Sequence, residues 1–366
     1  IVPENLISLA KKTSQMPVGI VSAHQTAAME SAKQAFELNL IMPIFIGDKN
    51  GIQEEANALN WDINSFEIID QNQFTSPTLD NSLNENLSKI NKKSIVLPLG
   101  EVKIKRKINS LNIIFRSNTK VNIWDQNKTR IFDKPKSEYT LRSLNSLLNS
   151  VQKAKVQLQN INLKLTIVDD NSDKITIKKM NLLSSKKEIS LNIINLNQNE
   201  FDGKIINEDN PETFGNLASL LKCFLIAKNE TEDLIFFVED DYLHKDTLIE
   251  EMLMTYERLA SQLNREIVLC PSDYPYLYTT DRKTNVLIGS HRHWQLIDKT
   301  LCTFLTSKII LNQYWENFVK NCNKRHDPFE KYLNEIYKEE YCLAPIPSLS
   351  VHFTNINSSY GIAPYI

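Results

Sequence analysis

Apolar and polar positions alternate at the start of the chain as they do in a small α/β unit. Short apolar runs at residues 18–22, 43–47 and 66–69 predict strands. Residues 26–38, which are rich in Ala, Met and Glu, and residues 53–59 predict the helices between them. Because strands that alternate with helices usually pair in parallel, we expect a small parallel sheet here.

This pattern stops at residues 71–93. The segment is polar, rich in Asn and Ser, and has few apolar anchors, which is the composition of a linker. We therefore divide the chain into a small α/β segment at residues 1–70, a polar linker at 71–93 and a longer domain at 94–366.

The longer domain again alternates apolar runs with amphipathic segments, which predicts a second α/β architecture. One expected helix carries Leu141, Leu144, Leu148 and Val151 on a single face. We expect strands at residues 112–115, 163–168, 191–196, 234–238, 266–270 and 302–307, and helices at residues 137–154, 214–225, 246–263 and 309–320, with a further helix opening at residue 326.

The 366 residues carry 42 basic and 44 acidic side chains, for a net charge of −2. This balance gives no broad electrostatic field for a nucleic-acid partner, and we expect none. The basic run at residues 103–107 alternates with apolar residues, which predicts a strand with one solvated face. Contact of this run with an anionic membrane surface is the alternative.

The five cysteines are odd in number and widely spaced, and no CxxC occurs. This spacing indicates neither a zinc site nor a disulfide framework. No apolar run approaches the ~20 residues that cross a bilayer, and the N-terminus lacks a signal-peptide pattern. We expect a cytoplasmic protein with reduced thiols, at most peripheral at the inner face of the membrane. The eight glycines form neither GxGxxG nor GxxxxGK(S/T), which argues against a glycine-rich phosphate cradle.

The apolar strand at residues 234–238 runs directly into Glu239, Asp240 and Asp241. In an extended segment, side chains two positions apart point the same way, so Glu239 and Asp241 can converge on one cation. Carboxylates suit a hard metal such as Mg²⁺ or Mn²⁺, which would neutralise a leaving diphosphate. An acidic turn that closes a strand is the alternative.

A second strand end is also acidic, because residues 163–168 lead into Asp169 and Asp170. In open α/β sheets, ligands bind in the crevice beyond the carboxyl ends of the strands. Two acidic strand ends in one sheet can therefore line one crevice.

The order of these motifs resembles the metal-dependent glycosyltransferases of the GT-A fold, and most closely the family-2 type. Residues 166–173 match the strand end V-D-D-x-S-x-D of that family, and residues 214–218 lie in the helix that follows. Residues 237–241 resemble its DxD motif, with Glu239 in place of the first Asp. The resemblance covers about residues 110–366 and implies a mixed, mostly parallel central sheet flanked by helices.

The same resemblance implies a reaction. A sugar would pass from a nucleotide-diphosphate donor to an acceptor hydroxyl, with inversion at the anomeric carbon and with Mn²⁺ or Mg²⁺ as cofactor. The acceptor would be a saccharide or a lipid-linked molecule, in the synthesis of a surface polysaccharide or glycoconjugate.

The resemblance places nucleotide contacts on Arg116, Asp169 or Asp170, Asn216 and Asp240. A carboxylate only accepts hydrogen bonds, which suits the imide N–H of a uracil-type base. Structural alternatives stay open. The two aspartates can cap the following turn, Arg116 can lie on the surface, and Asn216 can sit at a helix start.

The metal is placed by the same resemblance on Asp241. Glu239 would support Asp241 directly or through water, and the replacement of the family's Asp leaves direct coordination by Glu239 open. His352, near the C-terminal end, would be a third ligand, although an isolated histidine is more often structural.

The general base is placed by position at Asp327, with Asp273 in reserve. In the family a Glu precedes this Asp, whereas here it is His326. Because Asp327 stands before a proline, it also suits a helix N-cap. Trp294, in a polar and aromatic run, would either stack on a sugar or pack in the core.

Residues 1–70 carry a different resemblance. Residues 22–24, 30–35 and 40–48 resemble the start of phosphate acetyl- and butyryltransferases. Those enzymes need several hundred residues, and their catalytic groups lie mostly towards the C-terminus. We therefore expect a partial segment that packs or binds, with His24 structural.

Two hypotheses rival sugar transfer. A phosphate acyltransferase-related protein is supported by the start of the chain alone. A non-catalytic binding protein could retain the fold, since a fold alone does not fix a function.

Overall fold

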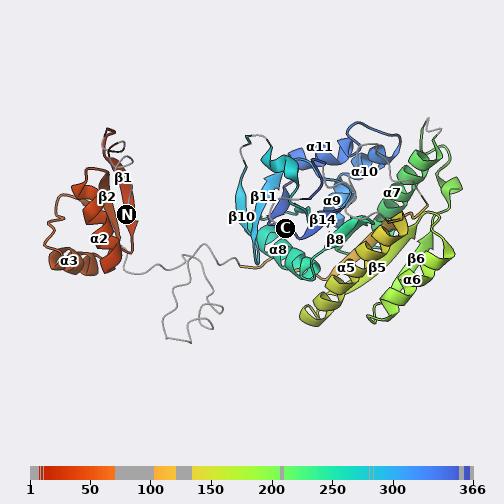
Figure 1. Cartoon of the computed structure of the whole chain (residues 1–366), viewed down its shortest axis with the longest axis horizontal. Coiled ribbons are helices and arrows are strands. Elements are labelled where there is room, and N and C mark those ends of the chain that lie inside the picture. Colours follow the sequence, from red (N-terminus) through yellow and green to blue (C-terminus); the bar gives the residue numbers. More distant parts are fainter. Residues whose placement is uncertain are drawn as a thin grey trace. The chain divides into compact units, whose positions relative to one another are not determined.

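The structure, a computed structural model, describes residues 8, 10, 12–70, 103–120, 134–206, 210–279, 281–282, 284–353 and 358–362. The chain divides into two compact units, Ile1–Glu101 and Val102–Ile366 (Figure 1). The predicted linker at residues 71–93 lies outside the described residues.

The first unit contains the small parallel sheet that the sequence predicts, with the strand order β1-β2-β3. Its second helix begins at Lys49 rather than at residue 53, because the Asp48 carboxylate accepts a hydrogen bond from the Gly51 N–H at 2.9 Å and caps the helix. The strands are β1 (Met16–Val21), β2 (Ile41–Gly47) and β3 (Glu67–Asp70), and the helices are α2 (Thr26–Glu37) and α3 (Lys49–Ala58).

Helices α2 and α3 pack on one face of this sheet. Phe45 of β2 contacts Trp61 and Phe66 edge-on, with ring centroids 5.4 and 5.9 Å apart. The other face carries Val21 and Ile69, which are 56% and 42% exposed. Within the described residues, the apolar core of this unit therefore lies on the helical side alone.

In the second unit, nine strands of the described residues form one sheet in the order β10-β11-β13-β9-β12-β7-β4-β5-β6. The neighbours β7, β4, β5 and β6 are parallel. Strand β12 is antiparallel to both β7 and β9, so β9 and its parallel neighbour β13 run in the direction of β7. This confirms the predicted fold class, a mixed and mostly parallel central sheet flanked by helices.

Strands and helices alternate along most of the second unit. The strands are β4 (Ser110–Ser117), β5 (Asn162–Asp169), β6 (Leu191–Asn195), β7 (Leu234–Glu239), β8 (Tyr242–His244), β9 (Val268–Leu269), β10 (Val286–Ile288), β11 (His293–Ile297), β12 (Phe304–Ser307), β13 (Cys342–Ile346) and β14 (Ser350–His352). The helices are α5 (Lys136–Gln157), α6 (Lys174–Ser185), α7 (Pro211–Glu230), α8 (Leu248–Leu263), α9 (Lys308–Gln313), α10 (Trp315–Cys322) and α11 (Lys331–Glu339), with short 3-10 helices η2 (Gln198–Phe201) and η3 (Pro275–Tyr278).

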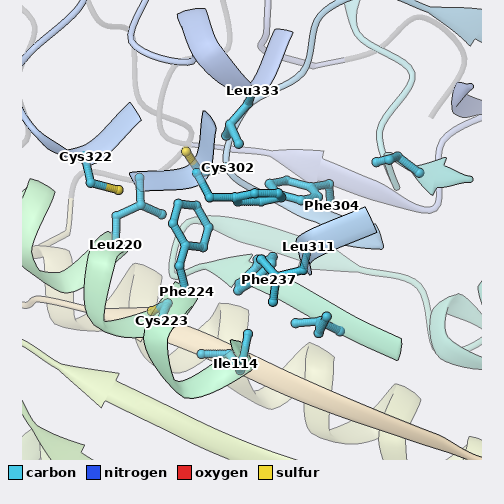
Figure 2. Close-up of a cluster of buried hydrophobic side chains, with 14 of the residues drawn as sticks. Ile114, Leu220, Cys223, Phe224, Phe237, Cys302, Phe304, Leu311, Cys322 and Leu333 are labelled. Atoms are coloured by element: carbon cyan, nitrogen blue, oxygen red, sulfur yellow. The ribbon is translucent and has the colours of Figure 1, made fainter. Parts of the chain in front are cut away.

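Alternate residues of the central strands point to opposite faces of the sheet and belong to two separate hydrophobic cores. Ile114 and Phe237 belong to the core with α7, and Phe224 of α7 packs edge-on against Phe237 at 5.0 Å (Figure 2). Phe115 and Phe236 belong to the core with α5 and α8. This two-residue period covers the sheet on both faces and leaves the strand ends for the site.

The clearest differences from the sequence prediction in the second unit concern three segments. Residues 103–107 form no strand. The predicted helix at residues 309–320 is two helices, α9 and α10, that meet at Tyr314. The last helix, α11, begins at Lys331 rather than at residue 326.

Arg106 explains why the basic run is not a solvated strand. Its guanidinium donates to Glu266 Oε1 at 2.7 Å and to Asp233 Oδ1 at 2.5 Å. The Arg106 side chain is only 22% exposed, so this residue ties an irregular segment to two acids elsewhere in the unit.

Replacing Arg106 by Met would leave Asp233 and Glu266 without their cation, and these acids are only 11% and 16% exposed. We expect the free energy of unfolding of the second unit to fall by about 3 kcal/mol. Urea denaturation of the full chain measures the change. Lys105→Met, an exposed neighbour, should change it by less than about 0.5 kcal/mol. Equal effects of the two substitutions would contradict this role of Arg106.

Among the residues that the structure describes, no helix has both the length and the apolar composition needed to cross a membrane.

Candidate active site

Three parallel strands bring the two predicted acid clusters together. β4 lies between β5 and β7, with Ser117 opposite Asp169 and Arg116 opposite Glu239. The carboxyl ends of the three strands therefore meet at one edge of the sheet, which is where ligands bind in open α/β folds.

The acid triplet (Glu239, Asp240 and Asp241) stands at the end of β7, and each of its carboxylates contacts a different basic side chain. These side chains come from three separate elements, β4, α5 and β14. The pairs are Arg116 Nη2–Glu239 Oε1 at 2.8 Å, Lys136 Nζ–Asp240 Oδ1 at 2.6 Å and His352 Nε2–Asp241 Oδ2 at 3.1 Å.

Asp240 is the most buried member of the acid triplet, with 8% of its surface exposed. Besides Lys136, it accepts hydrogen bonds from the Thr140 hydroxyl at 2.7 Å and from the Asn118 N–H at 3.3 Å. Burial works against the charge on Lys136, yet the carboxylates of Asp240 and Asp241 raise the pKa of that ammonium group. Asp240 is thus bound within the protein, and its nucleotide contact stays a prediction.

Asp241, the last member of the acid triplet, pairs with His352. The imidazole Nδ1 lies 3.1 Å from the carbonyl oxygen of Tyr360, and the Tyr242 ring stacks on the imidazole with centroids 5.0 Å apart. Burial opposes protonation of His352, whereas the Asp241 charge raises its pKa. His352 is the last residue of β14.

The donor set at Asp241 fits a divalent ion. Within the described ranges, no group of three or more His, Cys, Asp and Glu side chains is gathered around one point. A metal at a diphosphate site needs only one or two protein ligands, because phosphate oxygens and water supply the rest. The Asp241 carboxylate is a donor that Mn²⁺ or Mg²⁺ accepts. The imidazole nitrogen of His352 lies 3.1 Å from it.

Arg116 is an internal residue rather than a surface arginine, since its side chain is 13% exposed. It bonds the carbonyl and the side-chain oxygen of Asn216 as well as Glu239. Burial raises the pKa of Glu239, and Arg116 opposes that rise. Asn216 lies in the second turn of α7, whose N-cap is Asn210, so Asn216 does not start the helix.

Asp169 has the capping role that the sequence left open. One oxygen accepts the Ser117 hydroxyl at 2.7 Å, and the other accepts the Ser172 N–H at 2.9 Å. This bond closes the turn after β5.

Asp170 is held from two sides, by Asn118 Nδ2 at 3.0 Å and by Gln198 Nε2 at 2.8 Å. Gly215 of α7 packs directly on it, and a Cβ at that position would lie 2.6 Å from Asp170 Oδ2. Only glycine allows this approach. Both aspartates thus line the strand ends, and their contact with a base stays a prediction.

The two candidates for the general base, Asp327 and Asp273, differ in burial and in their hydrogen bonds. Asp327 is exposed in the loop before α11, and the N-cap position of that helix is Glu330, so the alternative N-cap role of Asp327 is wrong. Asp273 is buried and accepts hydrogen bonds from Tyr278 at 2.6 Å and Gln295 at 2.9 Å. Burial raises the pKa of Asp273 to about 6. The catalytic roles of both aspartates stay predictions.

Sequence reasoning missed Lys136 and Glu330. Glu330 is 9% exposed, and the Cys302 thiol lies 3.9 Å from its Oε1. Burial raises the pKa of Glu330 to about 8, the Glu239 charge adds to the rise, and Arg116 opposes it. The signal that could have pointed to Glu330 was its position three residues after Asp327, the predicted base.

Trp294 packs in the core, as the sequence allowed, and is fully buried. The five cysteines are free and buried as well.

No protein-family model matches the chain. Among curated proteins, it is similar to the phosphate butyryltransferase of Clostridium beijerinckii, with 31% identity over 77 residues. The match covers 21% of this chain and 26% of that enzyme, so the chain spans about a quarter of the length of its curated relative.

Nucleotide-sugar enzymes are among the solved structures that the chain is similar to, as the resemblance in the sequence implied. LgtC galactosyltransferase with donor and acceptor sugar analogs matches at 10% identity over 62% of this chain and 70% of that chain, with a TM-score of 0.30. UDP-glucose pyrophosphorylase with UDP-glucose matches at 9% over 69% and 96%, with a TM-score of 0.34. Glucosyl-3-phosphoglycerate synthase from Mycobacterium tuberculosis with Mg²⁺ and UDP matches at 8% over 56% and 58%, with a TM-score of 0.28. Identities and TM-scores this low do not define a function, so the function has to be inferred from the side chains of the site.

Glu330 makes the stability of the second unit depend on pH. The folded protein holds its pKa near 8, above the ordinary 4.5, so it keeps a proton that the unfolded chain releases. This stabilisation is full below the unfolded pKa and is lost as the pH rises through the folded pKa. From pH 5 to pH 8, we expect the wild type to lose up to about 3 kcal/mol more unfolding free energy than Glu330→Gln.

Urea denaturation across this pH range measures the difference. Glu339→Gln, an exposed acid at the end of the same helix, is the matched control and should follow the wild type. Parallel pH profiles of Glu330→Gln and the wild type would show that Glu330 is not protonated in the folded state.

Proposed function

We propose that the chain is a metal-dependent glycosyltransferase that moves a sugar from a nucleotide-diphosphate donor to an acceptor hydroxyl. The observation that carries this proposal is the meeting of two acidic strand ends at one sheet edge, with Asp241 3.1 Å from His352. We further propose inversion at the anomeric carbon, cytoplasmic synthesis of a surface polysaccharide or glycoconjugate, and Mn²⁺ or Mg²⁺ as cofactor.

The donor would lie across the strand ends. Asp170 and Asp169 border the place of the base, and Asn118 joins that place to the acid triplet because it bonds both Asp170 and Asp240. Arg116, which contacts Asn216 and Glu239, lies between the two acid clusters and is suited to the nucleotide contact that the sequence predicted.

Asp241 and His352 would hold the metal, and Glu239, bound by Arg116, would support them from outside the coordination shell. When bound, the metal neutralises charge that develops on the leaving diphosphate. Lys136 Nζ lies 4.0 Å from Asp241 and adds a fixed positive charge at the same place.

The proton of the acceptor hydroxyl has to be removed as the new bond forms. The predicted base, Asp327, and the buried Glu330 both stand in the segment that leads into α11, and Asp273 stays the reserve candidate.

A phosphate acyltransferase activity is the second candidate, and it is favoured by one observation, the 31% identity to phosphate butyryltransferase. That match covers 26% of the enzyme's length, so we propose for the first unit only a packing or binding role. A non-catalytic binding protein is the third candidate.

Substitution of Asp241 by Asn removes the charge that would hold the metal. With UDP- and GDP-sugars and Mn²⁺, we expect the release of nucleoside diphosphate to fall at least about 100-fold. Asp246→Asn, an exposed acid after β8, should retain the activity. Chelation of the metal should have the same effect on the wild type as Asp241→Asn.

Three outcomes would contradict the proposal. The first is turnover that Asp241→Asn leaves intact. The second is acyl phosphate formation from an acyl-CoA without any release from nucleotide sugars. The third is the absence of both activities and of nucleotide-sugar binding, which would favour the non-catalytic protein.

A further inference from the structure

The imidazole of His352 is held on three sides by three different parts of the second unit. Its Nε2 lies 3.1 Å from the Asp241 carboxylate. Its ring stacks on Tyr242 of β8, with centroids 5.0 Å apart, and its Nδ1 lies 3.1 Å from the carbonyl oxygen of Tyr360. These contacts together restrict both the position and the rotation of the ring.

Backbone contacts bring the two candidate metal ligands together. In the antiparallel ladder of β8 and β14, Tyr242 stands opposite His352. The Asp241 carbonyl accepts a hydrogen bond from the Phe353 N–H at 3.1 Å, so the backbone on either side of the ladder is joined as well. These contacts place the imidazole beside the carboxylate, but they do not decide which of its nitrogens carries a proton.

The Tyr360 carbonyl makes that decision. A backbone carbonyl only accepts hydrogen bonds, so the contact at 3.1 Å requires a proton on Nδ1. Nε2 then presents a lone pair towards the Asp241 carboxylate, and two electron-rich atoms at this distance need a cation between them, either a proton or a metal ion. Nδ1 keeps its own proton in both cases.

The opposite tautomer would close the site to a metal. With its proton on Nε2, a neutral imidazole would donate to Asp241 and have no lone pair on that side. Its unprotonated Nδ1 would then face the Tyr360 carbonyl, where two acceptors repel each other. In many metalloproteins, a histidine ligand donates its other ring N–H to a backbone carbonyl in this way.

The Tyr360 ring anchors the carbonyl. It lies 5.1 Å from the rings of both Tyr274 and Tyr276, between centroids. The Ser359 carbonyl accepts a hydrogen bond from the Tyr276 N–H at 3.0 Å, which ties the same segment to η3. Tyr274 is fully buried, and its hydroxyl lies 2.7 Å from that of Tyr242, so the anchor and the ring that stacks on His352 belong to one packed group.

We propose that Tyr360 is a positioning residue for the metal. Its ring anchors the segment at residues 358–362, and its carbonyl holds His352 in the tautomer that offers Nε2 to a divalent ion beside Asp241. This inference rests on the proposed function, in which Asp241 and His352 bind the metal.

Manganese binding tests the proposal without turnover. The full chain is titrated with Mn²⁺ in the presence of UDP, and EPR measures the free ion. Tyr360→Ala removes the anchor and should weaken Mn²⁺ binding about 10- to 100-fold, the usual cost of losing a partner behind a metal-bound histidine. Tyr360→Phe keeps the ring and should bind as the wild type does.

The matched control is Tyr341→Ala. Tyr341 is also a half-buried tyrosine, but it lies just before β13, at the amino end of that strand. Its replacement should leave Mn²⁺ binding unchanged. If Tyr360→Ala does not unfold cooperatively in urea, Tyr276→Ala takes its place, because it removes a ring that packs on Tyr360 and should also weaken Mn²⁺ binding.

Electron spin-echo spectra of the Mn²⁺ complex report on the histidine itself, through the coupling of the ion to an imidazole nitrogen. We expect this coupling in the wild type and in Tyr360→Phe, and its absence in His352→Ala. At saturating Mn²⁺, Tyr360→Ala should lose most of the coupling although the ion remains on Asp241. A general loss of stability would not remove the nitrogen signal from protein that still binds the ion.

Two results would overturn this inference, and they differ in what they say of the proposed function. If Tyr360→Ala keeps both the affinity and the nitrogen coupling of the wild type, Tyr360 does not orient His352, while the metal site on Asp241 and His352 stands. If the wild type binds Mn²⁺ without any nitrogen coupling, His352 is not a ligand, and the proposed metal site fails together with the role of Tyr360.

Discussion

Three neighbouring carboxylates at the end of a buried strand repel one another, and the second unit keeps them together by giving each its own basic partner. Arg116 comes from β4, Lys136 from the first residue of α5, and His352 from β14. Like charges at this spacing would otherwise protonate or separate. The pairing therefore fixes the positions of three elements around the strand ends, and the arrangement of the candidate site depends on it.

The three acids of the triplet also differ in the kind of partner that each one contacts. Glu239 is bound by Arg116, and Asp240 by Lys136, Thr140 and the Asn118 N–H. Asp241 contacts an imidazole, a group that can itself be a metal ligand. The motif thus resembles a DxD sequence, and we propose that Asp241 and His352 are the members of the site that bind the metal.

The sequence was sufficient to predict the features that are local in the chain. Apolar runs located β4, β5 and β7, and the acids at the ends of β5 and β7 followed directly from the pattern. Parallel pairing then implied that both acid clusters meet at one edge, which the register of Ser117 with Asp169 and of Arg116 with Glu239 bears out.

Contacts between distant residues were not predictable in this way. Arg106 lies 127 residues from Asp233 and 160 from Glu266, so a local pattern suggested a solvated strand where the fold places ion pairs. In the sequence, Lys136 looks like an ordinary lysine at the start of a helix. Its ion pair with Asp240 forms only because the fold brings the end of β7 next to α5. Glu330 differs from any other glutamate only through its burial beside Cys302, which no spacing in the sequence reveals.

The central claim is that the end of β7 binds the diphosphate of a nucleotide through a metal on Asp241 and His352. The most direct measurement is a crystal structure of the chain grown with UDP and Mn²⁺, with the anomalous signal of manganese used to locate the ion. The account predicts manganese coordinated by the Asp241 carboxylate, His352 Nε2 and both phosphates, with the base beside Asp169 and Asp170. UDP bound without a metal, or a manganese ion away from the Asp241–His352 pair, would contradict it.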